Sequence, residues 1–156
     1  MLALQPSFVS PARKRYAQLV AELEKRYGDN TRVVDPGHWA FEVLTSEARS
    51  QVVHVILVEE RAATRDTSRV VATSPIGPLP PRLDFEGLLR RNANLDVGAI
   101  CVEDLRTETG ELAPYLTLRA SHLIATADFE EIWEMVDKAA QVADALEKDI
   151  FARDQF

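Results

Sequence analysis

The spacing of apolar residues predicts a long amphipathic helix near each end of the chain. The first helix has its apolar face at 3.6-residue spacing, made by Tyr16, Leu19, Val20, Leu23 and Tyr27. Ser10 and Pro11 are typical of a helix start, because serine caps free N–H groups and proline is tolerated in the first turn. Gly28 is typical of a helix end, because glycine readily adopts the left-handed cap conformation.

The second long helix is predicted from a Thr126 cap to about residue 152. Its apolar face consists of Phe129, Ile132, Trp133, Val136, Ala140, Ala143, Leu146 and Ile150. The remaining face is acidic, since the chain from Asp128 onward carries nine Asp or Glu against three Lys or Arg. These carboxylates are most simply a solvated helix face.

Between the helices, short apolar runs predict five strands at 38–44, 52–59, 69–73, 97–102 and 115–120. Short polar links join the first three, which indicates an antiparallel meander. Segment 74–81 holds four of the eight prolines and is interpreted as a stiff crossover, because proline disfavours helix and central strand. A short helix over 84–91 follows, capped by Asp84, with Phe85, Leu88 and Leu89 as its apolar face.

The predicted element order is therefore α-β-β-β-α-β-β-α. Runs of consecutive strands indicate an α+β domain, with helices covering an antiparallel sheet. A length of 156 residues suits one such domain over residues 10–156, preceded by a flexible lead-in over residues 1–9.

Composition narrows the class of protein. Apolar residues make up 46% and charged residues 28% of the chain, which is typical of a globular domain. The net charge is -7, and the second half carries 16 acidic against 8 basic residues, so we expect no direct binding of nucleic acid. No apolar run spans a bilayer and no signal peptide is recognisable, which predicts no membrane partner. A single cysteine excludes an intrachain disulfide and fits a cytoplasmic location.

The sequence offers little catalytic chemistry, and we predict no catalytic residue, no metal site and no cofactor. Its six glycines never take the spacing of a phosphate-binding loop. His38, His54 and His122 have no local metal-ligand spacing. Cys101 lies in an apolar strand without a neighbouring base, so it is interpreted as a buried, inert thiol.

The middle of the chain resembles the YbjN-like proteins and the type III secretion chaperones. The shared features are the leucine-rich helix ending in Asn over 88–94, the strand 97–102, the turn at 110–112 and the closing helix 129–150. The order of elements is similar over residues 10–152, and the amino-acid sequence itself is similar over about residues 85–120. A difference is that segment 105–114 is longer than a tight turn. The resemblance implies an α+β homodimer without catalytic residues that holds a partly extended partner segment, and the YbjN-like branch is preferred.

The sequence therefore favours a non-enzymatic adaptor or chaperone-like protein that binds another protein and forms a homodimer. A short helix gains little from its own backbone and needs packing, so Phe85, Leu88 and Leu89 are predicted to contact a second copy or a partner. One alternative is a small-molecule sensor domain with a pocket between sheet and helices. Another is an enzyme that uses Cys101 or the clustered carboxylates. Exposed apolar patches favour protein binding, whereas a deep pocket with converging polar groups favours the alternatives.

Overall fold

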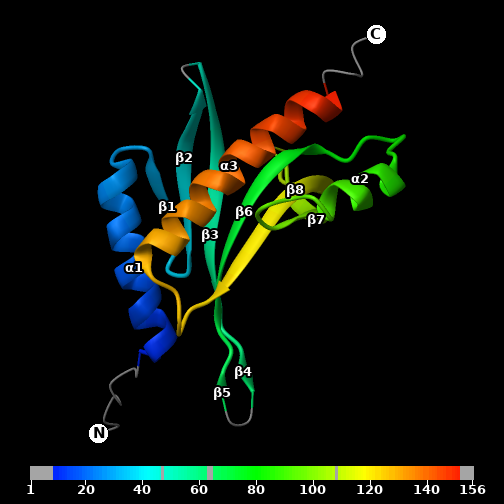
Figure 1. The fold of residues 1–156 in the computed structure, drawn as a ribbon. Helices are drawn as coiled ribbons and strands as arrows, with labels where there is room; N and C mark the ends of the chain where they lie inside the picture. Colours follow the sequence, from blue (N-terminus) through cyan, green and yellow to red (C-terminus); the bar gives the residue numbers. More distant parts are fainter. Residues whose placement is uncertain (1–8, 47, 63–64, 108, 152–156) are drawn as a thin grey trace, which may run out of the picture.

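The computed structural model describes residues 9–46, 48–62, 65–107 and 109–151, and within them a six-stranded antiparallel sheet packs against helices (Figure 1). The helices are α1 (Pro11–Tyr27), α2 (Phe85–Asn92) and α3 (Phe129–Phe151). The strands of the sheet, in spatial order, are β1 (Thr31–Asp35), β2 (His38–Ser46), β3 (Arg49–Val58), β6 (Arg69–Pro78), β8 (Leu112–Leu123) and β7 (Ala99–Arg106). The α+β class is confirmed, and the element order agrees apart from additional short strands.

The additional strands lie where the sequence is polar. β1 was not predicted, because its five residues are mostly exposed and lack an apolar alternation. A second small hairpin, β4 (Arg61–Ala62) with β5 (Arg65–Asp66), occupies the charged link between β3 and β6. β7 begins two residues later than predicted and both β7 and β8 are longer, so Pro114 lies inside β8, opposite Asp104.

The first helix has the ends that the sequence predicts. The Ser10 side chain accepts a hydrogen bond from the backbone N–H of Arg13, and Pro11 occupies the first turn. Gly28 has φ +57° and donates its N–H to the carbonyl of Glu24. Residues 1–8 of the lead-in predicted over residues 1–9 lie outside the described residues.

The start of α3 differs from the prediction, because Asp128 and not Thr126 caps the helix. The Asp128 carboxylate accepts from the backbone N–H of Glu131 at 2.8 Å, and Glu131 accepts from the N–H of Asp128 at 3.2 Å. This reciprocal pair is a capping box, which satisfies two N–H groups at once. Thr126 lies in the preceding turn, where its hydroxyl donates to the carbonyl of Leu123.

The prediction that the proline segment leaves the sheet was wrong, since β6 continues through Pro75 to Pro78. β3 pairs with β6 only as far as Thr73, and beyond that point β6 pairs with β8 alone. A proline nitrogen needs no partner on the side that β3 has left, so strand geometry survives there. A register shift between Pro75 and Gly77 accommodates the change.

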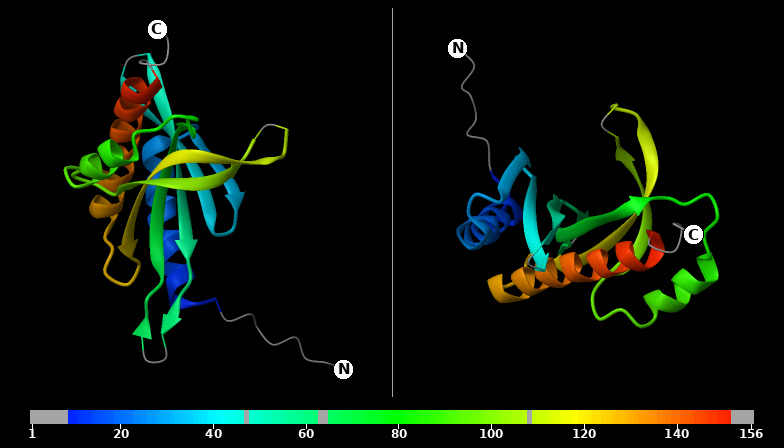
Figure 2. Two further views of the ribbon diagram at one scale, coloured as in Figure 1. Left: turned by 90° about the vertical axis from the view of Figure 1, so that its right-hand side faces the viewer. Right: turned by 90° about the horizontal axis from the view of Figure 1, so that it is seen from above.

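The core lies between one face of the sheet and the helices α1 and α3. Tyr16 of α1 reaches the sheet, where its hydroxyl donates to the carbonyl of Val55 at 2.6 Å. The fully buried side chains include Phe41, Val53 and Leu118 of the sheet and Ile132 and Val136 of α3. The opposite face is concave, because the β7–β8 hairpin rises on the side away from α3 (Figure 2, right). This concave face and the β7 edge carry the features considered next.

Candidate protein-binding surfaces

Helix α2 places the three predicted contact residues on two different sides. Asp84 caps the helix by accepting from the N–H of Gly87 at 2.9 Å. Leu88 is 9% exposed and belongs to the core, whereas Phe85 is 56% and Leu89 is 69% exposed. Leu89 follows Leu88 about 100° further round the helix, and on the short helix α2 only the Leu88 side is covered by the core. Of the three residues predicted to make contact, Phe85 and Leu89 are therefore the ones with exposed side chains, and their role in contact stays a prediction.

Strand β7 forms the sheet edge beside α2. Asn92, the last residue of α2, accepts from the N–H of Ile100 at 2.6 Å and donates to its carbonyl at 3.2 Å. Backbone groups of alternate residues point to the same side of a strand, so those of Val102 and Asp104 also point outward. The Val102 side chain is 50% exposed. Phe85, Leu89 and Val102 together are called the α2–β7 edge below.

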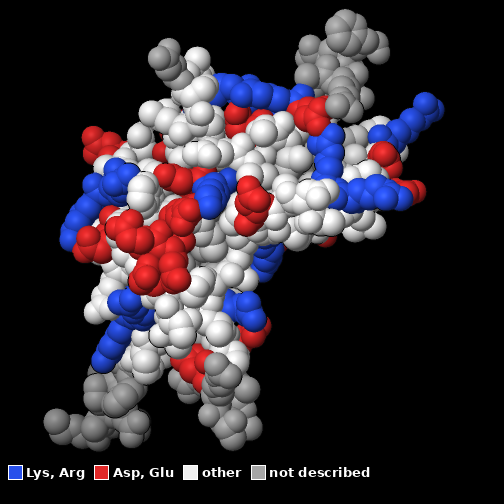
Figure 3. All heavy atoms as spheres, viewed as in Figure 1, with Lys and Arg blue, Asp and Glu red and all other residues white. Residues whose placement is uncertain are grey.

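Charge is divided unevenly over the helices. Figure 3 shows acidic side chains gathered over the first half of α3, whereas basic side chains surround α2. On α2 itself, Arg90 forms an i,i+4 ion pair with Glu86 at 2.7 Å, and Arg91 pairs with Asp149 of α3. The apolar side chains of the α2–β7 edge are therefore flanked by both signs of charge.

The concave face holds a small cavity lined mainly by His38, His54, Ile56, Thr73, Leu105 and Thr117. Its volume is about 120 Å³, well below the 300–1,000 Å³ of usual ligand pockets. Two of the lining residues bind Glu103, which accepts hydrogen bonds from Thr73 at 3.0 Å and Thr117 at 2.8 Å and pairs with Arg119. Burial alone would raise the pKa of the Glu103 carboxyl, but these bonds outweigh it and hold the pKa below its usual value.

Two histidines that looked unrelated in the sequence meet at the wall of this cavity. His38 Nε2 and His54 Nδ1 are 2.8 Å apart. Burial lowers the pKa of His54 to about 4, and the neighbouring His38 and Arg32 add to this effect. The pairing depends on the β2–β3 register, which the sequence does not fix. Within the described ranges, no three His, Cys, Asp or Glu side chains are arranged around one metal position.

Cys101 lies on the concave face of β7 in a half-buried position. Its Sγ is 3.6 Å from the carbonyl oxygen of Ala99. Burial raises the pKa of the thiol, and the negative charge of Glu103 raises it further. A nucleophilic cysteine needs a lowered pKa, so this environment favours the inert thiol.

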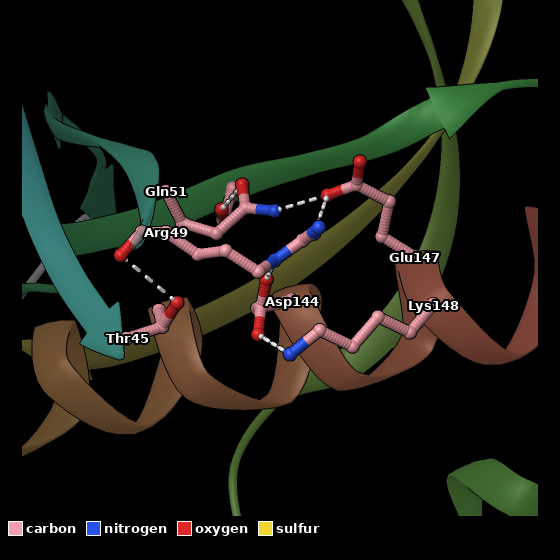
Figure 4. A network of polar contacts seen from close by, with 7 residues as sticks. Thr45, Arg49, Gln51, Asp144, Glu147 and Lys148 are labelled. Atoms are coloured by element: carbon pink, nitrogen blue, oxygen red, sulfur yellow. Dashed lines mark hydrogen bonds and ion pairs between the residues drawn. The ribbon is translucent and has the colours of Figure 1, made fainter. Parts of the chain in front are cut away.

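Two carboxylates in the second half of α3, Asp144 and Glu147, bind side chains of the β2–β3 hairpin (Figure 4). Asp144 accepts from Arg49 at 2.5 Å and from Lys148 at 2.7 Å. Glu147 accepts from Gln51 at 2.6 Å and lies 3.3 Å from Arg49. Burial alone would raise the pKa of the Asp144 carboxyl, yet the bonds from Lys148 and Arg49 outweigh it and lower the pKa. This network fastens α3 to the sheet.

No protein-family model matches the chain, and no curated protein sequence matches it either. Across the part of the chain that the structure describes, none of the helices combines the length and apolar character needed to cross a bilayer.

Proposed function

We propose that this protein is a non-enzymatic adaptor or chaperone-like protein that forms a homodimer and holds an extended segment of a partner protein. The observation that carries the proposal is the exposure of Phe85 and Leu89 on α2 and of Val102 on the neighbouring edge strand β7. Large apolar side chains grouped at a surface mark contact with another protein. The resemblance to YbjN-like proteins and type III secretion chaperones supports the same function.

The α2–β7 edge suits a second copy of the chain because its pattern is self-complementary. Phe85 and Leu89 lie one helical turn apart, and Glu86 and Arg90 have the same spacing. When two α2 helices pack antiparallel about a two-fold axis, Phe85 faces Leu89 of the second copy. Glu86 then lies near Arg90 of the second copy, which is the arrangement of an isologous interface.

The partner segment is assigned to a groove at the far end of the sheet. Asp29, Thr31, Arg32, Ala40, Glu42 and Val52 line this groove, which has a volume of about 250 Å³. Val52 is 39% exposed, and β1 covers β2 only from His38 to Phe41. The groove is thus lined by the apolar Ala40 and Val52 among polar and charged residues, and it lies beside strand β1 at the sheet edge, where an extended segment could pair with the sheet.

Light scattering coupled to size exclusion tests the dimer. We expect twice the chain mass for the wild type, and monomers for Phe85→Asp and Leu89→Asp, because each places carboxylates in a desolvated contact. Leu112→Asp is the matched control, since Leu112 is 65% exposed on β8 and should leave the dimer intact. Leu88→Asp is unsuitable, because it would disrupt the core. A monomeric wild type at tens of micromolar would contradict the dimer.

Photo-crosslinking tests the partner site. A photoreactive amino acid at position 52 should capture a defined protein from the native cell, whereas the same group at the exposed Glu134 of α3 should capture it poorly. Equal capture at both positions would contradict the groove assignment. A product at position 52 that consists of a small metabolite would instead favour the sensor domain.

A further inference from the structure

The cavity on the concave face is apolar although more than half of its lining residues are polar. His38 Nε2 and His54 Nδ1 are hydrogen-bonded to each other at 2.8 Å. The hydroxyls of Thr73 and Thr117 both donate to Glu103. Because these polar groups are satisfied within the sheet, they leave mainly ring carbons and methyl groups exposed to the cavity. Such a lining favours an apolar group over a charged or strongly hydrogen-bonding one.

The size of the cavity matches one side chain. An apolar cavity of about 150 Å³ accommodates a benzene molecule. The volume of about 120 Å³ therefore suits a slightly smaller group, such as the branched side chain of leucine. Two further aliphatic side chains, Ile56 of β3 and Leu105 of β7, complete the apolar walls. Leu105 belongs to the β7–β8 hairpin, which rises from this face of the sheet (Figure 2).

The cavity adjoins the groove to which the partner segment is assigned. Successive cross-strand partners from β1 to β6 form one row, which consists of Arg32, Ala40, His54 and Thr73. The first two line the groove, and the last two line the cavity. Adjacent strands lie about 4.8 Å apart, so the distance from Arg32 to the cavity is about 12 Å. A segment that enters at the β1 edge and crosses the concave face covers this distance in about four extended residues.

Arg32 supplies a charge at the groove end of this row. Its side chain is exposed, and none of the ion pairs within the described ranges involves it. The acidic groove residues Asp29 and Glu42 lie outside the row, since Glu42 pairs with Val52 and Asp29 precedes β1. The charge in line with the cavity is therefore positive, and its complement on a bound segment is a carboxylate.

We propose that the cavity receives a leucine, or an aliphatic side chain of similar size, from the held segment, and that Arg32 pairs with an aspartate or glutamate of the same segment. The two partner residues are four positions apart, because residues at that spacing lie on one face of an extended chain. This inference rests on the proposed function and specifies the chemistry of the segment.

NMR titration of the full chain with a synthetic peptide tests the proposal. The probe is a capped peptide of serine and threonine that carries one glutamate and one leucine four positions apart, and both orders of this pair are tested. We expect shifts of the Ile56, Thr73 and Leu105 methyl signals. Replacing the leucine of the peptide by alanine should weaken binding at least about tenfold. An alanine peptide that binds as tightly would overturn the proposal.

Two further titrations test the other possible occupants. Isobutanol carries the same branched group as leucine and should bind at least about tenfold more weakly than the peptide, since it lacks the contacts of the segment. Equal affinity would assign the cavity to a free small molecule. The same methyl shifts on concentrating the protein alone would assign it to a second copy of the chain. Either result would overturn the proposal.

Substitutions in the protein test both anchors. Leu105→Trp should fill the cavity and weaken binding of the leucine peptide at least about tenfold. Leu112→Trp is the matched control, because Leu112 lies outside the cavity lining and is 65% exposed. Arg32→Glu should weaken binding of the glutamate peptide about threefold or more, and a peptide with lysine in place of glutamate should recover it. Unchanged affinity in Leu105→Trp would overturn the cavity assignment, and unchanged affinity in Arg32→Glu would overturn the paired charge.

Crosslinking at position 52 separates this inference from the proposed function. If position 52 captures a partner and Leu105→Trp leaves that capture unchanged, the function stands and the cavity assignment fails. If position 52 captures no partner while the leucine peptide binds as expected, the cavity assignment stands and the proposed function fails.

Discussion

Removal of the Asp144 carboxylate should loosen the attachment of α3 to the β2–β3 hairpin. The carboxylate is 6% exposed and accepts two charge-assisted hydrogen bonds, from Arg49 and Lys148. Each such bond contributes about 1.5–3 kcal/mol. Both cations are more than a third exposed and regain water in Asp144→Ala, and burying the carboxylate itself has a cost. We therefore expect a net loss of about 2 kcal/mol, which corresponds to a fall in Tm of about 4–8 °C for a domain of this size.

Urea unfolding at pH 7 and at pH 3 tests whether Asp144 stabilises the protein through its charge or through packing. The folded-state pKa of Asp144 is depressed, so its contribution to stability is fully present above the unfolded value of about 3.9 and is lost as the pH falls through the folded value. The difference between wild type and Asp144→Ala should therefore shrink at pH 3. Glu134→Ala is the control, because Glu134 forms an exposed i,i+4 pair with Lys138 and should change stability by about 0.5 kcal/mol or less. An equal difference at both pH values would refute the electrostatic reasoning.

Three further substitutions test the packing. Gly98→Ala should cost more than about 2 kcal/mol in chemical denaturation, because Gly98 has φ +67° and an added Cβ would lie 2.5 Å from the carbonyl oxygen of Arg119. Leu88→Ala should cost about 2–3 kcal/mol by the same measurement, whereas Leu89→Ala should stay within about 0.5 kcal/mol in the monomeric state. Cys101→Ser should lower the free energy of unfolding by about 1 kcal/mol or less and retain partner crosslinking. Loss of crosslinking in a folded variant would favour the alternative of an enzyme that uses Cys101.

The helices were predictable because their signals are local. The Ser10 cap and the apolar stripe of α1 are contained in a few residues, and the structure confirms both. Threonine is a common cap residue, so the sequence predicts Thr126 as the cap of α3, whereas the reciprocal hydrogen bonds of Asp128 and Glu131 determine where the helix starts. The strand around Pro75 was not predictable for a different reason. A proline is tolerated in β6 only because β3 has already ended beside it, and no residue near Pro75 in the sequence indicates where β3 ends.

The candidate sites were less predictable because they depend on which face a side chain takes. Phe85, Leu88 and Leu89 satisfy one helical stripe equally well, and only the packing of α2 on the core separates Leu88 from the others. The contact between His38 and His54, which are sixteen positions apart in the sequence, depends on the register of the β2–β3 hairpin. The alternation of side chains along each strand predicts that both rings lie on the same face of the sheet, but it does not predict the distance between them.

The hydrogen bonds of Asn92 have a consequence for how the chain behaves at high concentration. Its carboxamide occupies the backbone N–H and carbonyl of Ile100 as a neighbouring strand would. The part of β7 that remains available runs only from Val102 to Arg106 and includes the charges of Asp104 and Arg106. Because this edge is short and charged, it is a poor template for the addition of further strands from other chains. Association at this edge should therefore stop at a closed pair, and replacement of Asn92 by leucine would lengthen the exposed edge and favour fibrous aggregation.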